Sequence, residues 1–239
     1  MRNTKNIEIM ARGSIANIIR DIQKTELSSD CVRFFRGQES VKWDLTPSLF
    51  RTNKFEKNEY EIYHEIISKC PADFKECTSD FEKMVKMQHY GIPTRLLDIT
   101  TNLIVALYFA CQECNEKENA VIYTFDVPKS ELFYFDTEKV TNQVNISQKT
   151  NQQNCDDLLC VVPELSNPRI IRQSGAFFLF NQKDINLKKK FNCRTFEISK
   201  GKKNELRKQL YNIGVNSSLF FPEIDRVAEE IKNKYKSQK

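Results

Sequence analysis

Apolar residues recur at helical spacing through much of the first half of the chain. Residues 14–27 begin with Ser14, a residue type that caps helices, and then place isoleucines three or four positions apart. Residues 58–70 and 79–91 repeat the pattern, and Gly91 closes the second stretch with a residue typical of helix C-termini. The pattern therefore predicts three amphipathic helices before residue 92.

A nearly unbroken apolar run occupies residues 103–111. It predicts a helix that starts near Thr101 or Asn102 and is buried over much of its circumference. Toward the end of the chain, residues 200–215 and 217–235 predict two further helices.

Strand-like patterns are concentrated in the second half. β-branched and aromatic residues mark 31–35 as an early strand, and the following Gly37 suggests that it ends in a turn. Residues 131–136 are typical of a short edge strand, whereas 142–155 are polar and indicate a surface loop or weak helix. The main later strands are expected at 119–127, 175–180 and 192–199.

This order of elements predicts an α+β fold, with a helical N-terminal half packed on a mixed, mostly antiparallel sheet. A chain of 239 residues is long enough to bury a sizeable core. We interpret it as one domain over residues 1–239, with a core at about 14–197 and C-terminal helices at 200–239.

Composition narrows the class of protein. Hydrophobic residues make up 40% of the chain and charged residues 29%, as in globular rather than disordered proteins. Neither a secretory signal nor an apolar run of about 20 residues is visible, so we expect a cytoplasmic protein without a membrane span.

The eight cysteines lack a complete zinc-ligand pattern and are interpreted as reduced thiols, with no metal. The net charge of +5 permits an anionic ligand such as a nucleotide, whereas nucleic acid is less favoured because no dense basic stripe is present.

Chemically distinctive residues gather in three segments, residues 33–38, 89–102 and 169–178. Each segment joins an apolar element to a turn, and we expect their side chains to project into one shared cleft. Arg36 in the first segment can present its planar guanidinium to a phosphate or carboxylate ligand. It suits a structural ion pair with Asp98 equally well. Gln38 adds a neutral donor and acceptor nearby.

The second segment follows a helix that ends at His89. This histidine can act as a general acid or base near neutral pH, although we favour a structural role at the helix end. Arg95 stands three residues before Asp98 and is a candidate partner for it. Asp98 or Thr100 can cap the buried helix that follows, and free N–H groups at that end also attract phosphate.

The third segment carries Arg169 and Arg172, which are three residues apart and can face one side of a helical turn. They suit phosphate binding, and a solvated pair is the alternative. Gln173 follows them, and Gly175 allows a backbone or ligand to approach closely.

Stretches from these three segments together resemble the FRG domain family, which is named for the element Phe35-Arg36-Gly37. The resemblance covers roughly Ser14 to Glu197. Members occur mainly in bacteria and phages, often in genomic settings that suggest defence or stress, so a bacterial or phage defence role is implied. The stretches are FFRGQ, HYGIPTRLLDITTNLIVALYFAC and RQSGAFFLF.

The order of elements is also similar to that of ADP-ribosyltransferases of the Arg–Ser–Glu type. This resemblance implies that Arg36 corresponds to their strand arginine, and that Thr100 and Thr101 correspond to their Ser/Thr-rich strand end. Their Glu-x-Glu loop has Gln173-x-Gly175 as its counterpart here, which lacks the carboxylate that stabilises the ribosyl cation.

The sequence therefore favours an enzyme directed at NAD or a similar nucleotide, acting by ADP-ribosyl transfer or NAD cleavage. Asp98 or Glu39 would supply the missing acid, and His89 would carry the proton. A non-catalytic module that binds a nucleotide or protein is the alternative, and a purely structural network around an Arg95–Asp98 pair is a third reading. The expected catalytic residues are Asp98 and His89, and the expected ligand-binding residues are Arg36, Gln38, Arg95, Thr100, Arg172 and Gln173.

Overall fold

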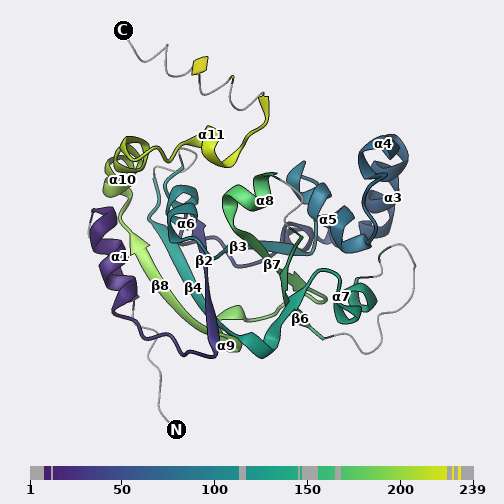
Figure 1. The fold of residues 1–239 in the computed structure, drawn as a ribbon, viewed down its shortest axis with the longest axis horizontal. Helices are drawn as coiled ribbons and strands as arrows, with labels where there is room; N and C mark the ends of the chain where they lie inside the picture. Colours follow the sequence, from purple (N-terminus) through teal and green to yellow (C-terminus); the bar gives the residue numbers. More distant parts are fainter. Residues whose placement is uncertain are drawn as a thin grey trace.

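The chain folds as α+β, with helices packed on one mixed sheet of eight strands (Figure 1). This computed structural model confirms the fold class expected from the sequence. The residues that it describes are 8–11, 13–112, 117–144, 146, 156–164, 168–224, 228 and 231–232.

The strands follow the order β1-β8-β4-β2-β3-β7-β6-β5 across the sheet. Neighbouring strands are antiparallel except at the two edges, where β1 runs parallel to β8 and β5 runs parallel to β6. The strands are β1 (Glu8–Ala11), β2 (Cys31–Gln38), β3 (Leu96–Thr100), β4 (Ala120–Pro128), β5 (Leu132–Tyr134), β6 (Leu158–Val162), β7 (Gly175–Phe180) and β8 (Asn192–Ile198).

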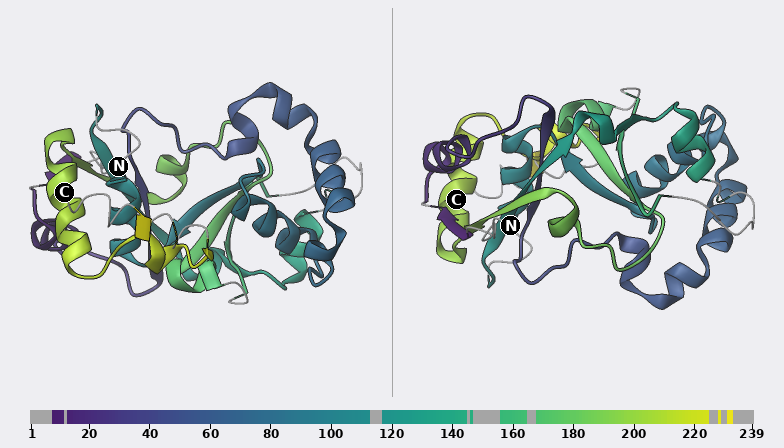
Figure 2. Two further views of the ribbon diagram at one scale, coloured as in Figure 1. Left: turned by 90° about the horizontal axis from the view of Figure 1, so that it is seen from above. Right: turned by 90° about the horizontal axis from the view of Figure 1, so that it is seen from below.

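Two groups of helices cover the two halves of the sheet. The core beneath α1, α6 and α10 includes residues of β2, β4 and β8, whereas α3, α4, α5 and α7 share a core with β3, β6 and β7. Figure 2 shows α1 and α10 at one end of the molecule and α3 to α5 at the other. The helices are α1 (Ile15–Gln23), α2 (Asn53–Lys57), α3 (Glu59–Lys69), α4 (Pro71–Phe74), α5 (Asp80–His89), α6 (Leu103–Ala110), α7 (Glu138–Gln143), α8 (Pro168–Gln173), α9 (Leu187–Lys190), α10 (Lys200–Asn212) and α11 (Ser217–Phe220).

The sheet is nearly split between β2 and β3. These strands pair only where Phe35 lies opposite Thr100, whereas β2 pairs with β4 along its whole length, from Cys31 to Gln38. Beyond the single pair, residues 36–38 of β2 and 97–99 of β3 diverge. The two halves of the sheet therefore enclose a gap on the side where Arg36 lies.

A backbone contact between α6 and β2 sets the geometry at this gap. Gly37 lies within β2, and a Cβ added there would lie 1.8 Å from the carbonyl oxygen of Ala106. The expectation that Gly37 ends the strand in a turn was wrong. The strand continues to Gln38, and the glycine serves the close approach of α6.

Several sequence predictions are confirmed and others are corrected. Ser14 caps α1, α5 ends at His89, and α6 begins after Asn102, whose side chain accepts a hydrogen bond from the Ile104 N–H. The pattern of apolar residues did not predict strand β3, which lies between two predicted helices. Most of the polar segment 142–155 lies outside the described residues. Of the predicted helix 217–235, Ser217–Phe220 form α11, the chain leaves the helix at Phe221, and residues 225–227, 229–230 and 233–235 lie outside the described residues.

In the part of the chain that the structure describes, no helix combines the length and apolar character needed to cross a bilayer.

Replacing Gly37 with alanine is expected to destabilise the fold by about 1–3 kcal/mol or more, because the methyl group cannot fit against the α6 backbone. Urea unfolding of the purified chain measures the change. Gly201→Ala is the matched control, since the nearest atom to an added Cβ there is 4.0 Å away and alanine favours the α10 helix. Equal stability of the Gly37→Ala variant and the wild-type chain would contradict the close approach.

Candidate functional site

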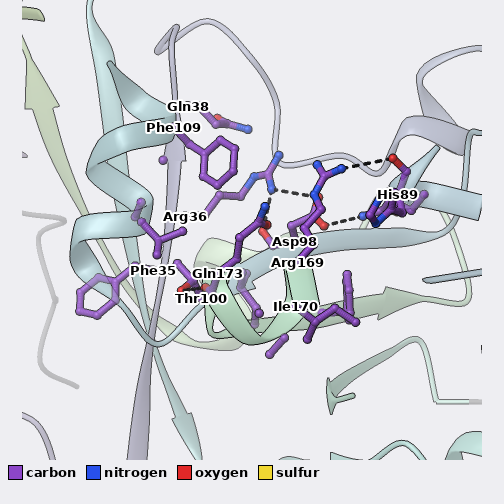
Figure 3. A pocket seen from close by; sticks show the side chains of 18 of the residues that line it. Phe35, Arg36, Gln38, His89, Asp98, Thr100, Phe109, Arg169, Ile170 and Gln173 are labelled. Carbon is purple, nitrogen blue, oxygen red and sulfur yellow. Dashed lines mark hydrogen bonds and ion pairs between the residues drawn. The ribbon is translucent and has the colours of Figure 1, made fainter. Parts of the chain in front are cut away.

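A cavity of about 300 Å³ lies at the gap between β2 and β3 (Figure 3). Its volume is at the lower end of the range of about 300–1,000 Å³ that small-molecule sites occupy. The walls come from β2, β3 and β7, together with helices α5, α6 and α8. Residues of all three chemically distinctive segments therefore line one hollow. The polar side chains among them are Arg36, Gln38, Glu39, Arg51, Gln88, His89, Asp98, Thr100, Gln112, Arg169 and Gln173.

Arg36 bridges the gap in the sheet. Its Nη1 donates a hydrogen bond to the main-chain oxygen of Asp98 at 2.6 Å and lies 3.9 Å from the Asp98 carboxylate. Its Nε is buried and has no hydrogen-bond partner within the described residues. Burial lowers the pKa of Arg36, the charge of Asp98 opposes this shift, and the charge of Arg51 adds to it. The guanidinium thus joins the two halves of the sheet and keeps a donor unused.

Asp98 is held by α5 from the opposite side. Its Oδ1 accepts a hydrogen bond from Gln88 Nε2 at 2.8 Å, and the Thr94 hydroxyl donates to the amide oxygen of Gln88. The Asp98 side chain is 62% exposed, so solvent and ligands can reach the carboxylate. The acid is therefore oriented at the open side of the cavity.

Gln38 and Glu39 provide two acceptors deeper in the wall. Gln38 is 3% exposed and its Nε2 donates to the Asp44 main-chain oxygen at 3.3 Å. Glu39 is 6% exposed. Among the residues that the structure describes, neither Gln38 Oε1 nor Glu39 Oε2 has a hydrogen-bond partner.

His89 lies at another part of the wall, in contact with the C-terminal segment. Its Nε2 is 2.7 Å from Glu223 Oε1, and Arg169 donates to the His89 main-chain oxygen at 3.2 Å (Figure 3 shows the Arg169 contact). Burial lowers the pKa of His89, the charge of Arg169 lowers it further, and Glu223 acts against both. The lowered pKa favours the neutral imidazole, and the Glu223 carboxylate is placed to accept a hydrogen bond from an Nε2–H.

Thr100 and Gln173 hold the cavity floor together. The Thr100 hydroxyl donates to the Gln173 main-chain oxygen at 2.6 Å and accepts from the Asn102 N–H at 3.0 Å. The Gln173 side chain donates to the Phe220 main-chain oxygen at 3.3 Å. Both residues line the cavity, and their polar groups fix the start of α6 and the position of α11.

The structure places Arg95 and Arg172 away from the cavity lining. Arg95 pairs with Glu59 of α3, with its Nε 2.5 Å from Glu59 Oε1, so the expected Arg95–Asp98 pair was wrong. Asp98 lies in β3, and residues three apart in an extended chain point to opposite faces. Arg172 is exposed and donates to the main-chain oxygens of Ser218 and Leu219.

Sequence reasoning missed much of the remaining lining. Trp43 and Arg51 lie in the irregular stretch after β2, and Phe109 belongs to a helix face that was interpreted as core. Gln88 gave no signal beyond its place beside His89. Only the fold brings these side chains to the gap.

Among the described residues, no group of three or more His, Cys, Asp or Glu side chains gathers closely enough to hold a metal ion.

Comparison with known proteins gives one match. Residues 32–119 match the model of the FRG domain, a range that contains β2, α5, β3 and α6 and therefore Arg36, His89 and Asp98. No curated protein and no solved structure matches the chain.

The neighbours of His89 predict opposite shifts of its pKa. Glu223→Gln removes the charge that favours the imidazolium, so the pKa of His89 should fall further. Arg169→Gln removes a positive charge, so the pKa should rise. An NMR titration of the ring signals measures both, with a His64→Gln variant to assign the two histidines. Shifts of the same sign in the two variants would contradict the geometry.

The lowered pKa of His89 also has a consequence for stability. The unfolded chain takes up this proton more readily than the folded chain, so the contribution is full above about pH 6.5 and is lost as the pH falls below that value. Thermal unfolding of the His89→Gln variant should show a weaker loss of stability between pH 7 and pH 5 than the wild-type chain. An unchanged pH dependence would contradict this assignment.

Proposed function

We propose that this chain, which carries an FRG domain at residues 32–119, binds an anionic nucleotide such as NAD in the cavity between β2 and β3. The observation that carries the proposal is the Arg36 side chain, which lines the cavity, is 16% exposed and keeps a buried Nε without a hydrogen-bond partner in the described chain. A phosphate supplies the acceptors that such a donor needs.

The charges around the cavity favour an anion. Arg51 and Arg169 line it together with Arg36, against the two carboxylates of Glu39 and Asp98. A buried guanidinium attracts phosphate more strongly than a solvated one, because the low dielectric constant around it screens the interaction less.

Two aromatic side chains offer faces to a base or a nicotinamide ring. Phe109 projects from α6 into the lining, close to Arg36 and Gln38 in Figure 3. Trp43 also lines the cavity and is 47% exposed, which is unusual for so large an apolar side chain. Both suit stacking against a planar ring. The volume of about 300 Å³ suits one nucleotide unit, so the other half of a dinucleotide would extend through the open side.

We assign to Asp98 and His89 the chemistry of nicotinamide removal from bound NAD. The bond between ribose C1 and the nicotinamide nitrogen breaks, and its electron pair leaves with nicotinamide. The Asp98 carboxylate stabilises the positive charge that develops on the ribose. Water or an acceptor hydroxyl then attacks C1 and loses a proton, which the free Nδ1 of neutral His89 accepts. The outcome is NAD cleavage or ADP-ribosyl transfer, and a defence or toxicity role would follow from depletion of NAD or modification of a target.

A non-catalytic nucleotide-binding module is the second candidate. One observation favours it: Gln173-x-Gly175 places no carboxylate beside the cavity, and the Gln173 side chain is committed to holding α11. Binding without turnover would identify this case.

Calorimetry with NAD and an assay of nicotinamide release separate these functions. Arg36→Lys should weaken NAD binding by about 10- to 100-fold, because lysine lacks the buried Nε donor. Asp98→Asn should retain binding and reduce nicotinamide release by about 10²- to 10³-fold.

Arg20→Lys is the control for this experiment, since Arg20 is an exposed residue of α1 whose Nη1 donates to Asn17. It should behave as the wild-type chain does. NAD binding without release would establish the binding module in place of the enzyme. Absence of NAD binding to the wild-type chain would remove the proposal.

A further inference from the structure

Three buried polar atoms without partners in the described chain belong to residues at the end of β2. Across the described residues, seven buried side-chain nitrogen or oxygen atoms lack a hydrogen-bond partner, and three of them belong to residues 36, 38 and 39. These are Arg36 Nε, Gln38 Oε1 and Glu39 Oε2, and all three residues line the cavity.

Burying these three atoms costs free energy unless a ligand supplies their hydrogen-bond partners. A buried polar atom without a partner loses its hydration and gains nothing in return, and a carboxylate loses most. The surrounding structure nevertheless fixes these groups firmly. Buried Lys203 donates to the Glu39 main-chain oxygen at 2.9 Å, which holds the chain where the strand ends.

The orientation of the Gln38 side-chain amide determines which of its two polar atoms lacks a partner. Because Nε2 donates to the Asp44 main-chain oxygen, the free atom is Oε1, which only accepts. The Glu39 carboxylate also only accepts when ionised. A ligand that satisfies this end of the cavity must therefore bring O–H or N–H donors, whereas the ligand group at Arg36 must bring acceptors.

An ionised Glu39 carboxylate repels a phosphate, and the buried Lys203 ammonium nearby donates to the main-chain oxygens of Glu39 and Glu118. The anionic part of the ligand belongs at Arg36, and a neutral part rich in donors belongs beside Gln38 and Glu39. Arg36 and Gln38 are two residues apart in β2 and project from the same face of the strand about 7 Å apart, and Glu39 follows in the bend after the strand. A phosphate joined to a ribose has the same order of groups and a similar length.

We propose that Gln38 and Glu39 accept hydrogen bonds from the hydroxyl groups of a ribose whose phosphate binds Arg36. This inference rests on the proposed nucleotide site. The cavity then selects ribonucleotides over their deoxy counterparts. Carboxylates elsewhere hold ribose hydroxyls in the same way, as in dinucleotide-binding folds.

The test uses ribose 5-phosphate and 2-deoxyribose 5-phosphate, titrated separately into the purified full chain by calorimetry. The wild-type chain should bind the ribose compound at least about tenfold more tightly, because the deoxy compound leaves an acceptor unpaired. Glu39→Met, which removes the acceptor, should bring the two affinities within about threefold. Glu39→Gln keeps the shape of the side chain and removes its charge. It should reduce the ratio of the two affinities by several fold. This variant also tests the proposal if the methionine variant does not fold.

Glu205→Gln is the matched control, because Glu205 pairs with Lys202 on the surface of α10 and does not line the cavity. It should keep the wild-type ratio. Equal affinities of the wild-type chain for the two sugar phosphates, or binding of neither, would overturn the ribose assignment. If NAD still binds in that case, the proposed nucleotide site stands and only the roles of Gln38 and Glu39 fail. If NAD does not bind either, both proposals fail.

Discussion

The contact between α6 and Gly37 governs the centre of the molecule. The helix crosses β2 at a distance that only a residue without a Cβ allows, since the Ala106 carbonyl oxygen occupies the place of that atom. The chain passes from β3 into this helix within the three residues that follow Thr100. Strand β3 must therefore end beside Phe35, and the rest of β3 diverges from β2. The cavity results from a close backbone contact on one side and an interrupted strand pair on the other.

An interrupted strand pair leaves main-chain groups that need partners. The Arg36 side chain supplies one of them, because its Nη1 donates to the main-chain oxygen of Asp98. The structural and ligand-binding interpretations of Arg36 are therefore compatible, because Nη1 stabilises the gap and Nε has no hydrogen-bond partner within the described residues. The same division applies to Gln38, whose nitrogen holds Asp44 while its oxygen stays unpaired within the described structure.

The sequence predicted the parts of the fold that depend on local pattern. Helical spacing identified α1, α3 and α5, and a nearly unbroken apolar run identified α6. Ser14 marked the start of α1, and Gly91 marked the end of α5. The sequence pattern missed β3, because its apolar residues Leu96, Leu97 and Ile99 also fit the approach to a buried helix. That error carried over to Arg95, since a strand sends Arg95 and Asp98 to opposite faces and a helical turn would not. The unpaired atoms at residues 36, 38 and 39 have no sequence signature, because they depend on which partners the tertiary fold withholds.

The arrangement of charge explains why these residues occur together. Arg36 keeps its positive charge even when burial lowers its pKa, since arginine does not lose its proton in proteins. Asp98 sits 3.9 Å away but is 62% exposed, so water weakens its attraction for the guanidinium. Glu39 is buried and directly follows the end of β2. The cavity thus presents a positive centre at Arg36, an exposed carboxylate at its open side, and in its wall an acid whose Oε2 has no hydrogen-bond partner among the described residues. A ligand that is anionic at one end and rich in hydroxyl groups at the next meets each of these groups with its complement.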